Sequence, residues 1–143
     1  MSVRQLREPS FLEDVRTTLE ATGVAPDCVV LELTETVLAT NDHGEIDTLH
    51  ALRALGCRVA LDDFGTGYSS LGYLAQLPVD VLKIDRTFVA EAGTGPRLLT
   101  LTRMTVGLGR ALQLTCVAEG VESEQQSKSL TQLGCVTAQG FLY

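Results

Sequence analysis

Two adjacent carboxylates, Asp62 and Asp63, close the apolar run 59–61, and a glycine-rich polar turn follows them at once. Such a run is typical of a buried strand, and the turn residues mark its end. Successive strand side chains point to opposite faces, so the two acids are expected to bracket two ligands instead of crowding one. Paired acids at the carboxyl end of a strand favour metal-assisted chemistry in an α/β protein. Taken alone, the pair fits an ordinary solvated turn somewhat better than a metal site.

Five apolar runs recur along the chain and helical patterns separate them, which predicts a parallel sheet with right-handed crossovers. The runs cover residues 29–33, 58–62, 79–84, 114–118 and 135–138. Acids at the ends of four of these strands fit the common mouth of a barrel better than the switch point of an open sheet. A closed barrel needs about 250 residues. The predicted fold is therefore α/β, an incomplete TIM-type (β/α) barrel with about five parallel strands alternating with helices.

Lys83 lies inside the apolar run 79–84, which is an unusual place for a lysine. A buried ammonium group is costly unless it has a partner or a function. We therefore expect Lys83 to contact one or more of the acids at the strand ends.

The composition of the chain limits which kinds of ligand it is expected to bind and in which compartment it is expected to work. The chain has 143 residues and a formal net charge of −7, which argues against a DNA or RNA polymer as ligand. A phosphate ligand still fits when divalent cations lie between it and the acids. Because no apolar run approaches the roughly 20 residues of a membrane span and the N-terminus has no signal-peptide core, we expect a cytoplasmic protein.

The four cysteines are far apart and lack the Cys-x-x-Cys spacing of zinc or redox sites. Each begins or adjoins an apolar run. We expect all four to be small buried residues in a reducing cytosol, without a metal or disulfide role. They are Cys28, Cys57, Cys116 and Cys135.

Five short motifs follow one another along nearly the whole chain. They are ELTE at 32–35, DDFGTGYSSL at 62–71, KID at 83–85, AEGVE at 118–122 and QGF at 139–141. In this order and spacing they resemble the EAL-domain family, the bacterial phosphodiesterases that open cyclic di-GMP. The resemblance implies a barrel, two Mg²⁺ or Mn²⁺ ions, and hydrolysis of one phosphodiester bond to give a linear dinucleotide.

The same resemblance implies a role for each acid of the predicted mouth. Glu32 and Asp62 would ligate one metal, and Asp62 would bridge to the second metal, with Asp63 beside it. Lys83 would contact the attacking water. Glu119 would be a ligand of the second metal or the catalytic base.

A second group of residues would support this machinery. Glu35 is implied as a catalytic residue that steadies the loop after the paired acids. The resemblance assigns support of the metals, the bound water or the substrate to Glu122, Gln139, Gly65 and Thr66.

The family's signature acid and a neighbouring arginine lie on an earlier strand, and its ligand asparagine would stand just before Met1. We therefore expect residues 1–143 to be a partial EAL domain that is impaired by itself. Open strand edges predict a homodimer or other self-association. Two alternatives remain: an inactive EAL-like module that binds nucleotide or a protein partner, or a natural chain that extends upstream.

Overall fold

Five parallel strands form one sheet in this computed structural model, which describes residues 1–34, 43–65, 71–90 and 96–143. The strand order is β1-β2-β3-β4-β5, so each strand pairs with the next one along the chain. The predicted α/β fold with about five parallel strands alternating with helices is confirmed. The strands are β1 (Val30–Thr34), β2 (Arg58–Phe64), β3 (Val81–Ile84), β4 (Thr115–Ala118) and β5 (Thr137–Ala138).

Strand β2 is longer than the sequence predicts. The prediction ends this strand at Asp62, whereas the structure continues it to Phe64. Pairing explains the difference, because Phe64 still pairs with Ile84 of β3 and is itself buried. The two acids are therefore part of the sheet and not of the turn that follows it.

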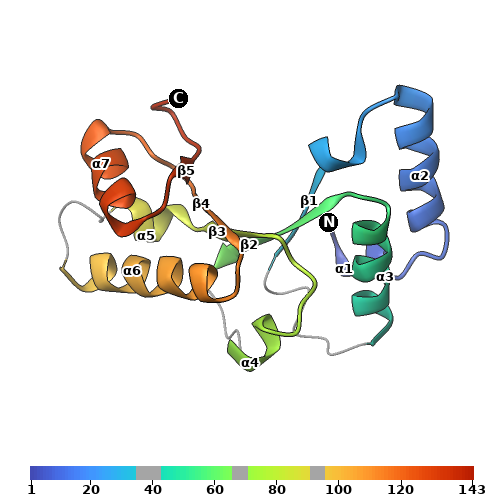
Figure 1. Cartoon of the computed structure of the whole chain (residues 1–143), viewed down its shortest axis with the longest axis horizontal. Helices are drawn as coiled ribbons and strands as arrows, with labels where there is room; N and C mark the ends of the chain where they lie inside the picture. Colours follow the sequence, from blue (N-terminus) through green and yellow to red (C-terminus); the bar gives the residue numbers. More distant parts are fainter. Residues whose placement is uncertain (35–42, 66–70, 91–95) are drawn as a thin grey trace.

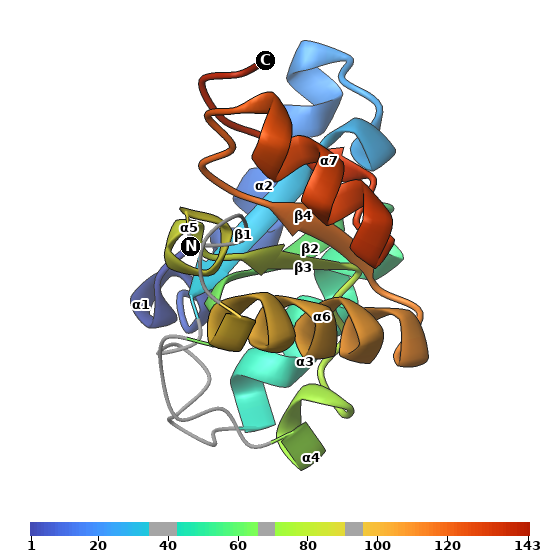
Figure 2. The same cartoon turned by 90° about the vertical axis from the view of Figure 1, so that its left-hand side faces the viewer.

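Helices connect the strands, and most of them lie in two groups, which Figure 1 shows at opposite ends of the molecule with α4 between them. Helices α1 to α3 accompany β1, and helices α5 to α7 accompany β3 to β5. The turned view of Figure 2 shows α6 running alongside the central strands. No helix in these ranges is both long and apolar enough to cross a bilayer. The helical elements are α1 (Val3–Leu6), α2 (Phe11–Thr22), η1 (Pro26–Cys28), α3 (His43–Ala54), α4 (Leu71–Leu74), α5 (Arg86–Ala90), α6 (Pro96–Ala111) and α7 (Glu124–Leu133).

The apolar core consists of two clusters of buried side chains. The larger cluster includes Leu33, Leu61 and Leu82, which lie on β1, β2 and β3. The smaller cluster joins Ile84 and Ala118, at the ends of β3 and β4, to the helices that follow. Burial of these side chains holds the carboxyl ends of the strands together. Each Å² of apolar surface removed from water contributes about 25 cal/mol of favourable free energy.

Local signals in the sequence explain where α7 begins and ends. Its first turn has a capping box, in which the Ser123 side chain accepts from the Gln126 backbone and the Gln126 side chain accepts from the Ser123 backbone. At the other end, the Cys135 amide donates to the Leu130 carbonyl at 3.0 Å across Gly134. This arrangement turns the chain directly from helix into strand.

The structure corrects one prediction about the cysteines. All four thiols are free, but Cys28 is exposed, whereas Cys57 and Cys135 are buried and Cys116 is half-buried. Cys28 ends the short helix η1 ahead of β1 and so lies outside the sheet. Burial raises the pKa of the Cys116 thiol to about 11, and it also raises the pKa of Cys57 and Cys135.

This difference predicts the reactivity of the thiols. At pH 8, Ellman's reagent should modify Cys28 rapidly in the folded protein and the three other cysteines only slowly, because burial hinders both access and ionisation. Denaturant should expose all four. A Cys28→Ser variant serves as control and should lack the fast phase; a fast phase that persists in this variant would contradict the burial of the other three thiols.

Candidate active site

Lys83 lies at the centre of the carboxyl ends of the strands. Its side chain is 7% exposed, and its ammonium nitrogen donates to three carboxylates from three different segments. The Nζ atom is 2.8 Å from Glu32 Oε1 on β1, 3.2 Å from Asp62 Oδ1 on β2, and 2.7 Å from Glu119 Oε1 after β4. The expectation that this lysine has partners at the strand ends is confirmed.

The charges of this cluster affect one another's ionisation. Burial opposes the charge on Lys83, but its hydrogen bonds to Glu119, Glu32 and Asp62 outweigh burial and raise the pKa of the ammonium group. Burial raises the pKa of the Glu119 carboxyl, and the nearby charge of Asp62 raises it further, against the opposite effect of Lys83. Lys83 is therefore a fixed positive charge, and the Glu119 carboxyl holds a proton more readily than an ordinary glutamate does.

A β-bulge brings the two adjacent acids to the same place. Leu61 pairs with Leu82, whereas Phe64 pairs with Ile84, so β2 has one more residue than β3 over this stretch. Asp63 takes up the extra residue with a φ of 56°, a left-handed conformation that aspartate adopts more readily than most residues. Strand alternation is interrupted here, and the expectation that the two acids point to opposite faces is wrong.

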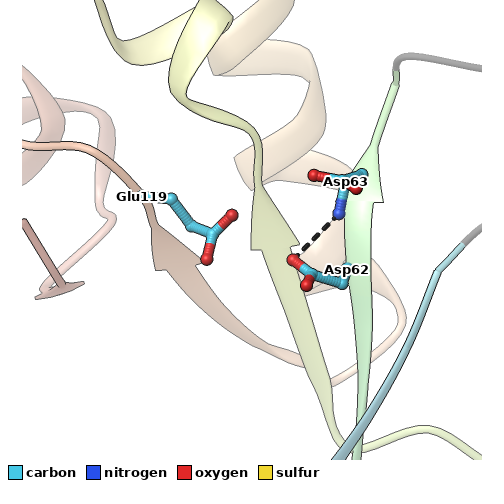
Figure 3. A group of neighbouring side chains, drawn as sticks. All are labelled: Asp62, Asp63 and Glu119. Carbon is cyan, nitrogen blue, oxygen red and sulfur yellow. Dashed lines mark hydrogen bonds between the residues drawn. The ribbon is translucent and has the colours of Figure 1, made fainter. Parts of the chain in front are cut away.

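As a result, Asp62, Asp63 and Glu119 gather in one group, which Figure 3 shows at the ends of β2 and β4. Each offers a carboxylate oxygen, and the three oxygens lie within 4.8 Å of one another. The backbone amide of Asp63 also donates to Asp62 Oδ1 at 3.0 Å, which orients that carboxylate. All-oxygen, carboxylate-rich sets of this kind suit hard divalent cations, so these residues fit a magnesium- or manganese-type ion. Glu32 joins the group through Lys83.

Glu119 is held from two sides. Its backbone amide donates to the Ile84 carbonyl at 3.0 Å, which extends the pairing of β3 and β4 by one residue. Gln139, which follows β5, donates through Nε2 to Glu119 Oε1 at 2.6 Å. The segment after β5 thus supplies a side-chain amide that donates to Glu119 Oε1, the same oxygen that accepts from Lys83.

Asp85, which the sequence motifs left without a role, lies beside the group. Burial and the charges of Asp62 and Asp85 raise the pKa of the Asp63 carboxyl. Asp85 itself accepts from the Thr87 amide at 2.9 Å and from the Thr87 hydroxyl, contacts that lower its pKa against the effect of burial. The signal was in the sequence, because Asp85 directly follows an apolar strand in the way Asp62 does.

The other residues that the sequence predicts for the site are not shown to join the carboxylate group. Glu35 and Thr66 lie outside the described residues. Within the described ranges, Glu122 is exposed and does not join the carboxylate group, while its backbone amide donates to Gln126 Oε1 at 2.9 Å. Gly65 follows β2 with a φ of 96°, and a methyl group there would lie 2.9 Å from the Phe88 ring, so Gly65 permits the close approach of β2 to α5.

Comparison with known protein families gives a match over the whole chain. The model of the EAL domain family matches residues 1–143. The cyclic di-GMP phosphodiesterase RocR of Pseudomonas aeruginosa is 40% identical over 139 residues, which are 97% of this chain and 36% of RocR. The chain thus spans about a third of the length of that relative.

Solved structures agree with the sequence comparison. The EAL domain of Mycobacterium smegmatis DcpA superposes with a TM-score of 0.93 at 45% identity, over 99% of this chain and 64% of the other. Klebsiella pneumoniae BlrP1 in a complex with manganese and cyclic di-GMP has a TM-score of 0.89 at 33% identity, over 97% of this chain and 36% of the other.

Proposed function

Because the chain belongs to the EAL domain family, we propose that it provides the metal-binding and catalytic part of a cyclic di-GMP phosphodiesterase. The observation that carries this proposal is the convergence of Asp62, Asp63 and Glu119 around Lys83. RocR is named as a cyclic di-GMP phosphodiesterase, and the structure of BlrP1 contains manganese and cyclic di-GMP.

We propose that Glu32, Asp62 and Asp63 would hold two divalent ions, Mg²⁺ or Mn²⁺, with Glu119 as a further ligand or as the base. When bound, two such ions acidify a water and neutralise charge on the phosphodiester, which is what hydrolysis of this bond requires. The arrangement of the carboxylates from separate strands supports the assignment.

The remaining groups act around the attacked phosphorus. Lys83 is a fixed positive charge, which suits it to orient the attacking water and to offset negative charge that develops on the phosphoryl oxygens. Glu119 is either a ligand of the second ion or the acceptor of a proton from that water, because a carboxylate bound to a metal ion does not also act as the base. Gln139 holds the Glu119 carboxylate in place by donating to it. Glu35, Glu122, Gly65 and Thr66 keep the supporting roles that the family resemblance implies.

We further propose that residues 1–143 form part of an EAL domain that works in the cytoplasm and associates with a second copy. The coverage of 64% of a solved EAL-domain chain supports the first statement. Four free cysteines support a reducing compartment. Exposed Val136 and Phe141 near β5 and Val30 on β1 support association at the edges of the sheet.

The direct test is conversion of cyclic di-GMP to the linear dinucleotide with Mn²⁺ or Mg²⁺, followed by chromatography. We expect conversion that is slower than that by a complete EAL domain, that EDTA abolishes and that added metal restores. Binding of the dinucleotide without conversion would contradict the enzymatic proposal and favour a nucleotide-binding module instead.

Asp62→Asn tests the metal group within the same assay. Asp62 belongs both to the oxygen group and to the contacts of Lys83, so we expect turnover to fall at least about 100-fold and Mn²⁺ binding to weaken. Asp47→Asn is the matched control, because it removes the same charge from an exposed position on α3. Equal activities of the two variants would exclude the proposed metal group.

A further inference from the structure

Arg86 is an exposed cation beside the carboxylate group. It follows Asp85 directly and begins α5, so it leaves the sheet at the same edge as the acids. Its stem packs on the backbone that carries Glu119: a methyl group at Gly120 would lie 2.7 Å from Arg86 Cβ and 3.9 Å from Cδ. Arg86 is thus an exposed cation whose stem packs against a neighbouring segment of the fold.

The charges at this edge are strongly unbalanced. Glu32, Asp62 and Glu119 all accept from Lys83, so the charge of this lysine is engaged by the acids at the reacting centre. Asp63 and Asp85 add two more acids at the same edge. A cyclic dinucleotide has two phosphodiesters on opposite sides of its ring, so when one lies at the carboxylate group the other lies outside it and needs a separate cation.

We propose that Arg86 binds this second, unreacted phosphodiester and thereby selects a cyclic dinucleotide over substrates with one phosphate. The inference rests on the proposed function and adds a specificity residue to it. A guanidinium group presents paired donors that match two phosphate oxygens, and its charge persists at every pH at which the protein is folded. Because the stem is already packed against Gly120, binding costs less side-chain freedom than for a free arginine.

The inference is tested by comparing two substrates in Mn²⁺: cyclic di-GMP, with two phosphodiesters, and bis(p-nitrophenyl) phosphate, with one. Arg86→Gln should lower kcat/KM for cyclic di-GMP roughly 10- to 100-fold, mainly through KM, because a charge-assisted contact is lost. The small diester should change less than about twofold, since it does not reach Arg86. Arg86→Lys should recover part of the loss, because the charge remains without the paired donors.

Arg103→Gln on α6 is the matched control, because it removes the same charge from another exposed position and should affect neither substrate. An equal loss on both substrates in Arg86→Gln would overturn the inference and show that Arg86 only positions Glu119 or Asp85. An unchanged KM for cyclic di-GMP would overturn it as well.

Failure of the proposed function is distinguishable from failure of this inference. If the unmodified chain hydrolyses neither substrate, the proposed function fails, and equilibrium dialysis with cyclic di-GMP and cyclic GMP then decides the role of Arg86. Arg86→Gln should weaken binding of the two-phosphate ligand at least about tenfold more than binding of cyclic GMP. Equal weakening, or no binding of cyclic di-GMP by the unmodified chain, would overturn the inference.

Discussion

Lys83→Met should lower turnover about 10²- to 10³-fold and at the same time make the stability of the fold depend more strongly on divalent metal. Without the ammonium group, Glu32, Asp62 and Glu119 repel one another at the end of the sheet. Loss of a preorganised charge at the reacting centre typically costs about 10²–10³ in rate. The free energy of unfolding should fall by about 1–3 kcal/mol, less than for a fully buried pair because Glu32 is 47% exposed.

Metal should then stabilise this variant more than it stabilises the unmodified protein. A divalent cation that binds only the folded state raises stability by mass action, and in Lys83→Met it also removes the repulsion among the carboxylates. The measurement is thermal unfolding with EDTA and with Mn²⁺. Lys128→Met is the matched control, since Lys128 is 75% exposed on α7 and pairs with Glu124 at the surface. An equal metal-induced shift in Tm for Lys83→Met and the unmodified chain would contradict the mutual repulsion of these carboxylates.

Gly140→Ala should strongly destabilise the protein, although it adds only one methyl group. Gly140 has a φ of 153°, and a methyl group there would lie 2.3 Å from both the backbone nitrogen and the backbone oxygen of Val121. Neither atom can yield easily, because the Val121 amide donates to Gln139 and the Val121 carbonyl accepts from Leu142. We expect a loss of about 2–4 kcal/mol in the free energy of unfolding, measured by urea denaturation.

Gly107→Ala is the matched control with the opposite sign. Gly107 lies inside α6, and nothing lies within 4 Å of a methyl group there. Alanine should therefore stabilise the helix by about 0.5–1 kcal/mol. Gly140→Ala should also lower activity, because Gln139 next to it holds Glu119. Equal stability of the two variants would show that the segment around Gly140 shifts freely.

The strands were predictable because each is a short apolar run between polar or glycine-rich segments. Predicted and observed strands agree within one or two residues at most ends, and the first one, predicted at 29–33, lies at Val30–Thr34. The partners of Lys83 were predictable for a related reason: a lysine within an apolar strand must be compensated, and acids stood at the neighbouring strand ends.

The geometry of the paired acids was not predictable in the same way. Strand alternation places neighbouring side chains on opposite faces, and only the register between β2 and β3 reveals the extra residue at Asp63. Register depends on which strands become neighbours, which is a tertiary property. The exposure of Cys28 escaped prediction because an apolar neighbourhood in sequence does not show whether a residue lies in the sheet or just before it.

The order β1-β2-β3-β4-β5 has a consequence for how the molecule is made. During synthesis from the amino end, each of the strands β2 to β5 leaves the ribosome with its preceding neighbour already present as a template, so none has to wait for a distant segment. Lys83 emerges after Glu32 and Asp62 and before Glu119. Its charge can therefore be compensated by the two earlier acids while the rest of the chain is still being translated at about 5–20 residues per second.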